Sequence, residues 1–122
     1  MHRTKLIQEL FSWNFHKEAI QSEEMRKIQA KIKTIDKLIQ KAAPDRPLNQ
    51  INKIDLAILR LSIFELIIDK STPPKVVVDE AVELGKEFGS DSSPAFINGA
   101  LGQLIKLKKI KTDKKDIQKN PN

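Results

Sequence analysis

The chain contains no cysteine and only two histidines among its 122 residues. Without cysteine it can form neither disulfides nor thiolate metal sites. His2 and His16 lie far apart with no cluster of carboxylates around them, so no metal site is predicted. The N-terminus has no apolar targeting segment, and no apolar run approaches the ~20 residues of a membrane-spanning helix. We therefore expect a cytoplasmic protein that has no membrane contact, cofactor or metal.

The sequence also lacks a glycine-rich cofactor loop and any recognisable catalytic constellation. Glu80 and Glu83 lie on one helical turn and look like paired carboxylates, but no base, nucleophile or metal ligand accompanies them. We therefore predict a binding protein and not an enzyme.

Positive charge is in excess and is unevenly distributed. The formal net charge is +6, and residues 103–122 carry seven lysines against two aspartates. An excess of this kind favours a polyanionic partner such as nucleic acid. Because lysine-dense segments with few apolar residues cannot offset their ordering entropy, we expect 112–122 to be a disordered basic tail.

The chain is organised around residues 54–68, which are apolar on almost every side. A surface helix has one apolar stripe, whereas a helix that is apolar nearly all round must be surrounded by protein. Asn52 is placed to cap its N-terminus, and the prolines at 73–74 prevent the helix from continuing much further. Arg60 and Glu65 interrupt the apolar run. We interpret them as a structural charge network, because buried charges must be paired.

Apolar residues at helical spacing predict further helices over 3–15, 22–42, 75–88 and 93–105. Ser22 is a predicted N-cap of the second of these helices, and Gly89 is predicted to end the third as its C′ residue. Ser93 is the predicted N-cap of the last helix, with Pro94 at its first helical position.

The predicted fold is all-α, a compact bundle of about five to six helices with a basic C-terminal tail. Residues 1–111 form one domain, in which 1–43 supply the N-terminal helices and 44–111 a C-terminal helical subdomain. Gly99 and Gly102 lie inside the last helix, where glycine costs about 1 kcal/mol against alanine. Close approach by a neighbouring helix would explain them.

Four motifs resemble the NusB family of transcription antitermination factors. They are RTKLIQELFSW over 3–13, DLAILRLSIFEL over 55–66, PKVVVDEAVELGKEFG over 74–89 and SPAFINGAL over 93–101. The last three follow the order found in the family and are together highly specific. The resemblance implies an all-helical fold of two small subdomains packed together.

Members of this family bind the boxA element of nascent RNA together with NusE, which is also a small-subunit ribosomal protein. The pair helps RNA polymerase pass terminators, especially on ribosomal RNA operons. The resemblance therefore implies three partners: NusE, single-stranded boxA-type RNA and the RNA polymerase antitermination complex.

Two groups of residues are expected to make these contacts. His2, Arg3 and Lys5 form a reduced counterpart of the basic N-terminal arm of the family and are predicted to contact RNA. The NusE contacts implied by the resemblance are Phe11, Phe15, Asp55, Ser92 and Phe96. Phe15 ends a full apolar face and Phe96 lies beside a polar loop, so each is either a partly exposed anchor or ordinary core.

The chain departs from the family pattern in three places. The segment before residue 22 is shorter than usual and lacks a whole helix, the basic arm is reduced, and Ser92 stands where members often have an acid. Two other functions stay open, namely an RNA-binding region like that of ribosomal RNA cytosine methyltransferases and a helical scaffold that binds no RNA. RNA binding that requires NusE would separate the leading hypothesis from the scaffold, and a fused or adjacent methyltransferase would support the other alternative.

Overall fold

The computed structural model describes residues 3–17 and 22–112, and within them all regular structure is helical. The helices are α1 (Arg3–Trp13), α2 (Glu23–Ala30), α3 (Ile32–Ala42), α4 (Lys53–Ile63), α5 (Pro74–Phe88) and α6 (Ser93–Leu107). A 3-10 turn η1 (Leu48–Gln50) precedes α4, and a π-helical segment η2 (Phe64–Asp69) continues it. The all-α prediction is therefore confirmed. Apart from Thr112, the predicted tail lies outside the described residues.

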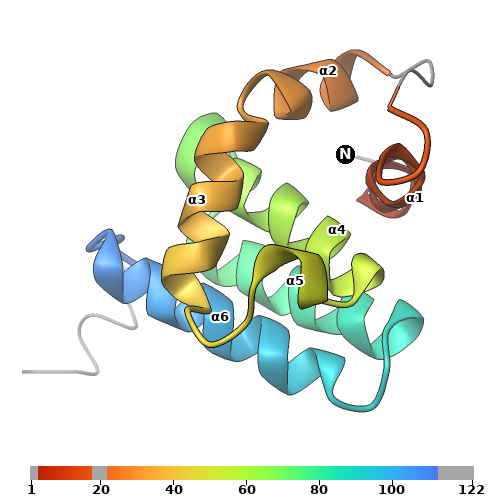
Figure 1. The fold of residues 1–122 in the computed structure, drawn as a ribbon. Coiled ribbons are helices and arrows are strands. Elements are labelled where there is room, and N and C mark those ends of the chain that lie inside the picture. The colour runs from red at the N-terminus through yellow and green to blue at the C-terminus, as the bar shows by residue number, and fades with distance from the viewer. Residues whose placement is uncertain (1–2, 18–21, 113–122) are drawn as a thin grey trace, which may run out of the picture.

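Helix α4 occupies the centre of the bundle and contacts α1, α3, α5 and α6 (Figure 1). Helices α5 and α6 are joined by a short turn and pack against each other. Helix α2 packs mainly on α1 and α3, at the edge of the molecule away from α5 and α6 (Figure 1). None of the helices within 3–17 and 22–112 is long and apolar enough to cross a membrane.

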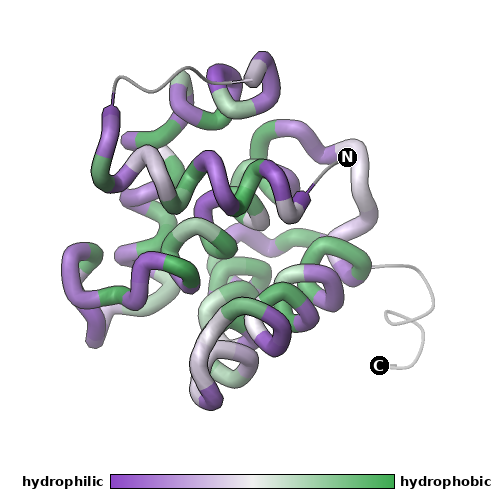
Figure 2. The backbone as a smooth tube through the Cα atoms, turned by 90° about the vertical axis from the view of Figure 1, so that its right-hand side faces the viewer, coloured by the Kyte–Doolittle hydropathy of each residue, from purple (hydrophilic) through white to green (hydrophobic). Residues whose placement is uncertain are grey.

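The central position of α4 follows from its sequence. Every residue from Asp55 to Ile63 is buried, so this part of the helix has no solvent-facing side. The other helices show alternating apolar and polar residues along their length (Figure 2), and their apolar side chains join one core cluster with those of α4. The prediction that 54–68 forms the hub is confirmed. Asn52 caps it as expected, because its Oδ1 accepts the N–H of Ile54 at 2.8 Å.

The helix predicted over 22–42 is two helices. Ser22 is the N-cap, as predicted, and its Oγ accepts the N–H of Met25 at 3.2 Å. At Lys31, however, the backbone leaves the helical region with φ −112° and ψ 14°. Met25 in α2 and Ile39 in α3, on either side of the bend, are both fully buried.

The turn between α5 and α6 differs from its prediction at three residues. Gly89 has φ −93° and is extended, so it is not a left-handed C′ residue. Ser93 is the first residue of α6 and Pro94 the second, while Ser92 precedes the helix without a side-chain capping bond. The buried Ser93 Oγ instead accepts the N–H of Ser90 at 2.9 Å. Glycine is needed at 89 because a Cβ there would collide with the Ser93 side chain.

The prediction for Gly99 and Gly102 is wrong. Both are exposed on α6, and a Cβ built on either would have nothing within 4 Å. No neighbouring helix approaches them, so packing within the described chain does not explain these glycines.

Candidate RNA- and protein-binding surfaces

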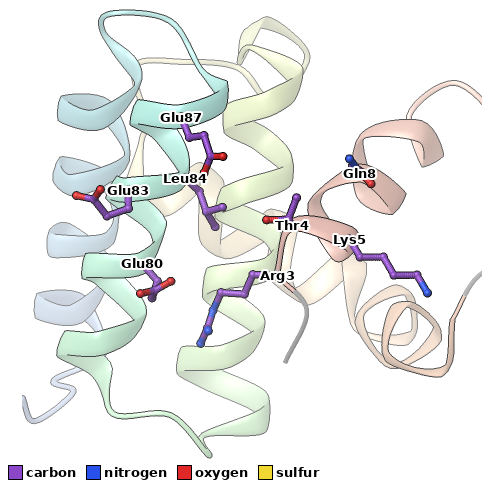
Figure 3. A pocket seen from close by; sticks show the side chains of 8 residues that line it. All are labelled: Arg3, Thr4, Lys5, Gln8, Glu80, Glu83, Leu84 and Glu87. Atoms are coloured by element: carbon purple, nitrogen blue, oxygen red, sulfur yellow. The ribbon is translucent and has the colours of Figure 1, made fainter.

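A groove of about 760 Å³ lies between α1 and α5 (Figure 3). Its α1 wall carries the cations Arg3 and Lys5, and its α5 wall carries three glutamates, Glu80, Glu83 and Glu87. Figure 3 shows the Lys5 side chain extending away from α5. The groove therefore has one basic and one acidic side and is not a uniformly basic channel. Two of these glutamates, Glu80 and Glu83, were recognisable in the sequence as a pair on one turn, and only the fold places them opposite the predicted basic arm.

Arg3 forms a largely buried ion pair. Its Nη2 lies 2.9 Å from Oε2 of Glu65, and its Nε donates to Oε1 at 3.3 Å. Burial raises the pKa of Glu65 above the ordinary 4.5, the Arg3 guanidinium lowers it in part, and the nearby Asp69 carboxylate raises it again. Arg3 thus joins α1 to η2, and its contact with RNA stays a prediction. Lys5 is exposed, and His2 lies outside the described residues.

Arg60 forms a second ion pair, at the C-terminal end of α1. Its Nε and Nη2 donate to the Asp36 carboxylate at 2.9 and 3.0 Å, and its Nη1 donates to Asn14 Oδ1 at 3.3 Å. The guanidinium also lies 5.3 Å from the centroid of the Trp13 ring. Arg60 and Glu65 are therefore structural charges, as predicted, although each pairs with another helix. The Arg60 contacts also position the end of α1, which the exposed Phe15 follows.

An aromatic patch lies along α1, and we define it by Phe11, Phe15 and Phe88. The rings of Phe11 and Phe15 meet edge to face with centroids 5.3 Å apart. Phe15 is 58% exposed and Phe88 is 38% exposed, while Phe11 is half-buried. Phe11 and Phe88 line an apolar pocket of about 350 Å³ together with Ile7 and Ile54. Phe15 was expected to be either a partly exposed anchor or an ordinary core residue, and its exposure supports the first interpretation.

Phe88, a member of this patch, was not among the contact residues predicted from the sequence. Its position as the last residue of α5, directly before a glycine, was the one available sign of exposure.

Asp55 is buried at 2% exposure, in the first turn of α4. A carboxylate is favoured there by the helix dipole. Its Oδ1 has no hydrogen-bond partner among the described residues. The neighbouring Ile54 lines the pocket of the aromatic patch, whereas the Asp55 side chain is not exposed at the surface. Its contact with NusE stays a prediction.

Ser92 directly precedes α6, and Phe96 lies in the first turn of that helix. Ser92 is exposed, and Phe96 is half-buried. The Arg46 guanidinium stacks over the Phe96 ring, 4.1 Å from its centroid, and both residues line a pocket of about 300 Å³ between the end of α3 and α6. The sequence analysis missed Arg46, because only the fold brings its loop beside α6. Of the predicted NusE contacts, Phe11 and Phe96 thus line different pockets, and Asp55 is buried.

Comparison with known proteins matches this fold and these motifs to one family. The NusB family matches residues 15–106. The transcription antitermination protein NusB of Chloroflexus aggregans is 52% identical over 73 residues, which cover 58% of this chain and 49% of that protein. The corresponding protein of Roseiflexus castenholzii is 48% identical over 73 residues, covering 58% and 51%. The chain thus spans about half the length of the curated relatives it matches.

Solved structures share the whole fold. T. maritima NusB superposes with a TM-score of 0.77 at 25% identity, covering 95% of this chain and 94% of that one. A crystal structure of the antitermination factors NusB and NusE in complex with dsRNA superposes with a TM-score of 0.72 at 23% identity, covering 86% and 93%. Since the family match extends over most of the sequence and the solved relative has the same arrangement of helices, this chain belongs to the NusB family.

Proposed function

We propose that this protein is a transcription antitermination factor that binds single-stranded boxA-type RNA together with NusE in the cytoplasm. It would join the RNA polymerase antitermination complex and support transcription of ribosomal RNA. It would act by binding and not by catalysis. Family membership supports the proposal, as does the solved complex of a structural relative with NusE and RNA.

The observation that carries the proposal is the exposure of Phe15. A phenylalanine that is 58% exposed contributes little to the core, yet this ring is held in edge-to-face contact with Phe11. Exposed aromatic side chains beside a polar rim are typical anchors of protein interfaces. Lys5 lies on α1 and Phe15 in the turn that directly follows it, so one segment would present both an apolar anchor for NusE and a cation for RNA phosphate.

RNA affinity would come from both members of the complex. The basic arm on this chain is small, and Arg3 is already paired with Glu65. We therefore expect weak RNA binding by the protein alone and stronger binding in the presence of NusE. Phosphate contacts would supply most of the affinity, and unstacked bases of the single strand would supply sequence preference.

The test is the affinity for purified NusE of a Phe15→Ala variant. If Phe15 is an anchor, binding should weaken by ~2 kcal/mol or more, which is about 30-fold. The urea midpoint should hardly change, because the ring is mostly exposed. Val76→Ala is the matched control, since Val76 is 43% exposed on α5 and outside the aromatic patch. Equal NusE affinity of wild type and both variants would place the interface elsewhere, and failure of wild type with NusE to bind boxA-type RNA would contradict the function.

A further inference from the structure

A second basic surface lies where η2 and α6 end. A pocket of about 340 Å³ there is lined by three lysines, Lys70, Lys108 and Lys109, and by Thr72, with apolar residues as its floor. All three lysines are exposed, and none of the described residues that line the pocket is a carboxylate. Asp69, the carboxylate next to Lys70 in the chain, accepts a hydrogen bond from Ser71 Oγ. The pocket is therefore uniformly basic, unlike the groove between α1 and α5.

The backbone at this pocket is strained at two of the three lysines. Lys70 has φ 59° and Lys109 has φ 51°, and they are the only non-glycine residues with positive φ in the described part of the chain. Both residues lie where a helical segment ends. At the end of η2, the Lys70 N–H donates to Glu65 O at 3.0 Å, and after α6 the N–H of Ile110, which follows Lys109, donates to Ile105 O at 3.0 Å. Helix ends of this kind usually carry glycine at the left-handed position. Lysine stands at both places although glycine would fit the backbone better.

The helix dipole does not explain these two positions. A cation is favoured near the C-terminal end of a helix, but that benefit is available anywhere in the last turn. Lys106 and Lys108 already occupy such places at the end of α6 without backbone strain. Strained residues concentrate at functional sites. Two helix ends that are far apart in sequence bring their strained lysines to the same pocket.

We propose that this pocket binds a backbone phosphate of the single-stranded RNA, at a second contact remote from α1. The inference rests on the proposed RNA-binding function. Three ammonium groups and the Thr72 hydroxyl offer hydrogen-bond donors to phosphate oxygens. Among the residues that the structure describes, none that lines the pocket is aromatic, so these residues offer no platform for stacking a base. The contact would therefore recognise phosphate charge and not base sequence. The end of α6 and helix α1 lie on opposite sides of the molecule in Figure 1, so an RNA that reaches both would extend across the domain.

The experiment measures how the affinity for a single-stranded oligouridylate falls with salt, for the protein alone and with NusE. Lys70→Gln, Lys108→Gln and Lys109→Gln are combined in one variant. Each phosphate contact on a single strand contributes about 0.7 to the slope of log affinity against log salt, so loss of this one phosphate contact should lower the slope by about 0.7. Lys33→Gln, Lys37→Gln and Lys41→Gln remove the same charge from exposed positions on α3 and should leave the slope unchanged.

A second variant separates the phosphate contact from a structural role. Lys70→Gly with Lys109→Gly should keep or raise the urea midpoint, because glycine is unstrained at positive φ, and should still flatten the salt dependence. Lower stability with an unchanged slope would overturn the proposal and make the lysines structural. Equal slopes for the pocket variant, the α3 control and wild type would overturn it while leaving RNA binding intact. If wild type binds no oligouridylate with or without NusE, the proposed function falls together with this inference.

Discussion

The two halves of the molecule are attached to the central helix in different ways. Helices α5 and α6 meet α4 through buried apolar side chains. Helices α1 and α3 also use apolar contacts, but each adds an ion pair to a charge buried in α4 or η2, through Arg3–Glu65 and Arg60–Asp36.

This difference separates stability from orientation. Apolar burial is non-directional, whereas an arginine–carboxylate pair holds only in one geometry. A buried ion pair adds little net stability but is costly to break on one side. The half that carries Lys5 and most of the aromatic patch is thus the half whose orientation is set by charge. We expect the apolar core to dominate stability and the ion pairs to control where the predicted contact residues lie.

The largest effect is expected from the apolar core. Leu59→Ala or Ile63→Ala removes a side chain that is 1% exposed. Each should cost about 2–5 kcal/mol in the free energy of unfolding, measured by urea denaturation. A loss below about 1 kcal/mol at both positions, the size typical of exposed sites, would mean that α4 is not the centre of the core.

Breaking the pair on α3 should cost less. Asp36→Ala leaves the Arg60 guanidinium buried without its carboxylate and should destabilise the protein by about 2 kcal/mol, since hydrogen bonds to charged groups have this size. The same urea experiment on Arg60→Met with Asp36→Leu tests the interpretation, because replacing both partners of a buried pair by apolar residues is often neutral. A double variant as unstable as Asp36→Ala would show that the pair itself, and not the orphaned charge, determines stability.

A variant in the apolar half tests whether partner contacts extend beyond α1. Phe96→Ala should weaken NusE binding by ~2 kcal/mol or more if Phe96 is an interface anchor. The loss in unfolding free energy should be smaller than that of a core variant, because the ring is half-buried under Arg46. Calorimetric titration with NusE and a urea melt give the two quantities. A variant that melts like a core mutant but binds NusE normally would restrict the interface to the aromatic patch.

The smallest expected effect is the pH dependence contributed by Glu65. Because its pKa is raised in the folded protein, the folded state binds this proton more tightly than the unfolded state. The contribution of Glu65 to stability is therefore most favourable below 4.5 and falls as the pH rises through the folded pKa. Urea midpoints of wild type minus those of Glu65→Gln should decline over this window. Glu83→Gln, at an exposed glutamate paired with Lys86, should leave the pH profile parallel to that of wild type.

Much of the fold was predictable because its signals are local. The apolar circumference of α4, the cap at Asn52 and the spacing within α5 and α6 depend on residues within a few positions of one another. The break at Lys31 and the packing of Ser93 under the turn at Gly89 were not predictable, because both depend on how one helix meets the rest of the bundle.

The candidate contact residues divide in the same way. Phe11, Phe15, Asp55, Ser92 and Phe96 were named from the family resemblance, which depends on sequence motifs alone. The exposure of these residues could not be predicted from the motifs, and the structure shows that Phe15 is exposed and Asp55 is buried. Arg46 and Phe88 were missed because their neighbours come from other helices.

The sequence by itself determined the helical class, the identity of the central helix and the family, since hydrophobic periodicity, caps and motifs are properties of the chain order. Only the tertiary structure decided which charged side chains form ion pairs with one another. Arg3 and Glu65 form an ion pair although they are 62 positions apart in the sequence. Lys70 and Lys109 line the same pocket because two helices end beside each other. Electrostatic interactions depend on distance in space and on burial, and the order of residues determines neither before the helices have packed.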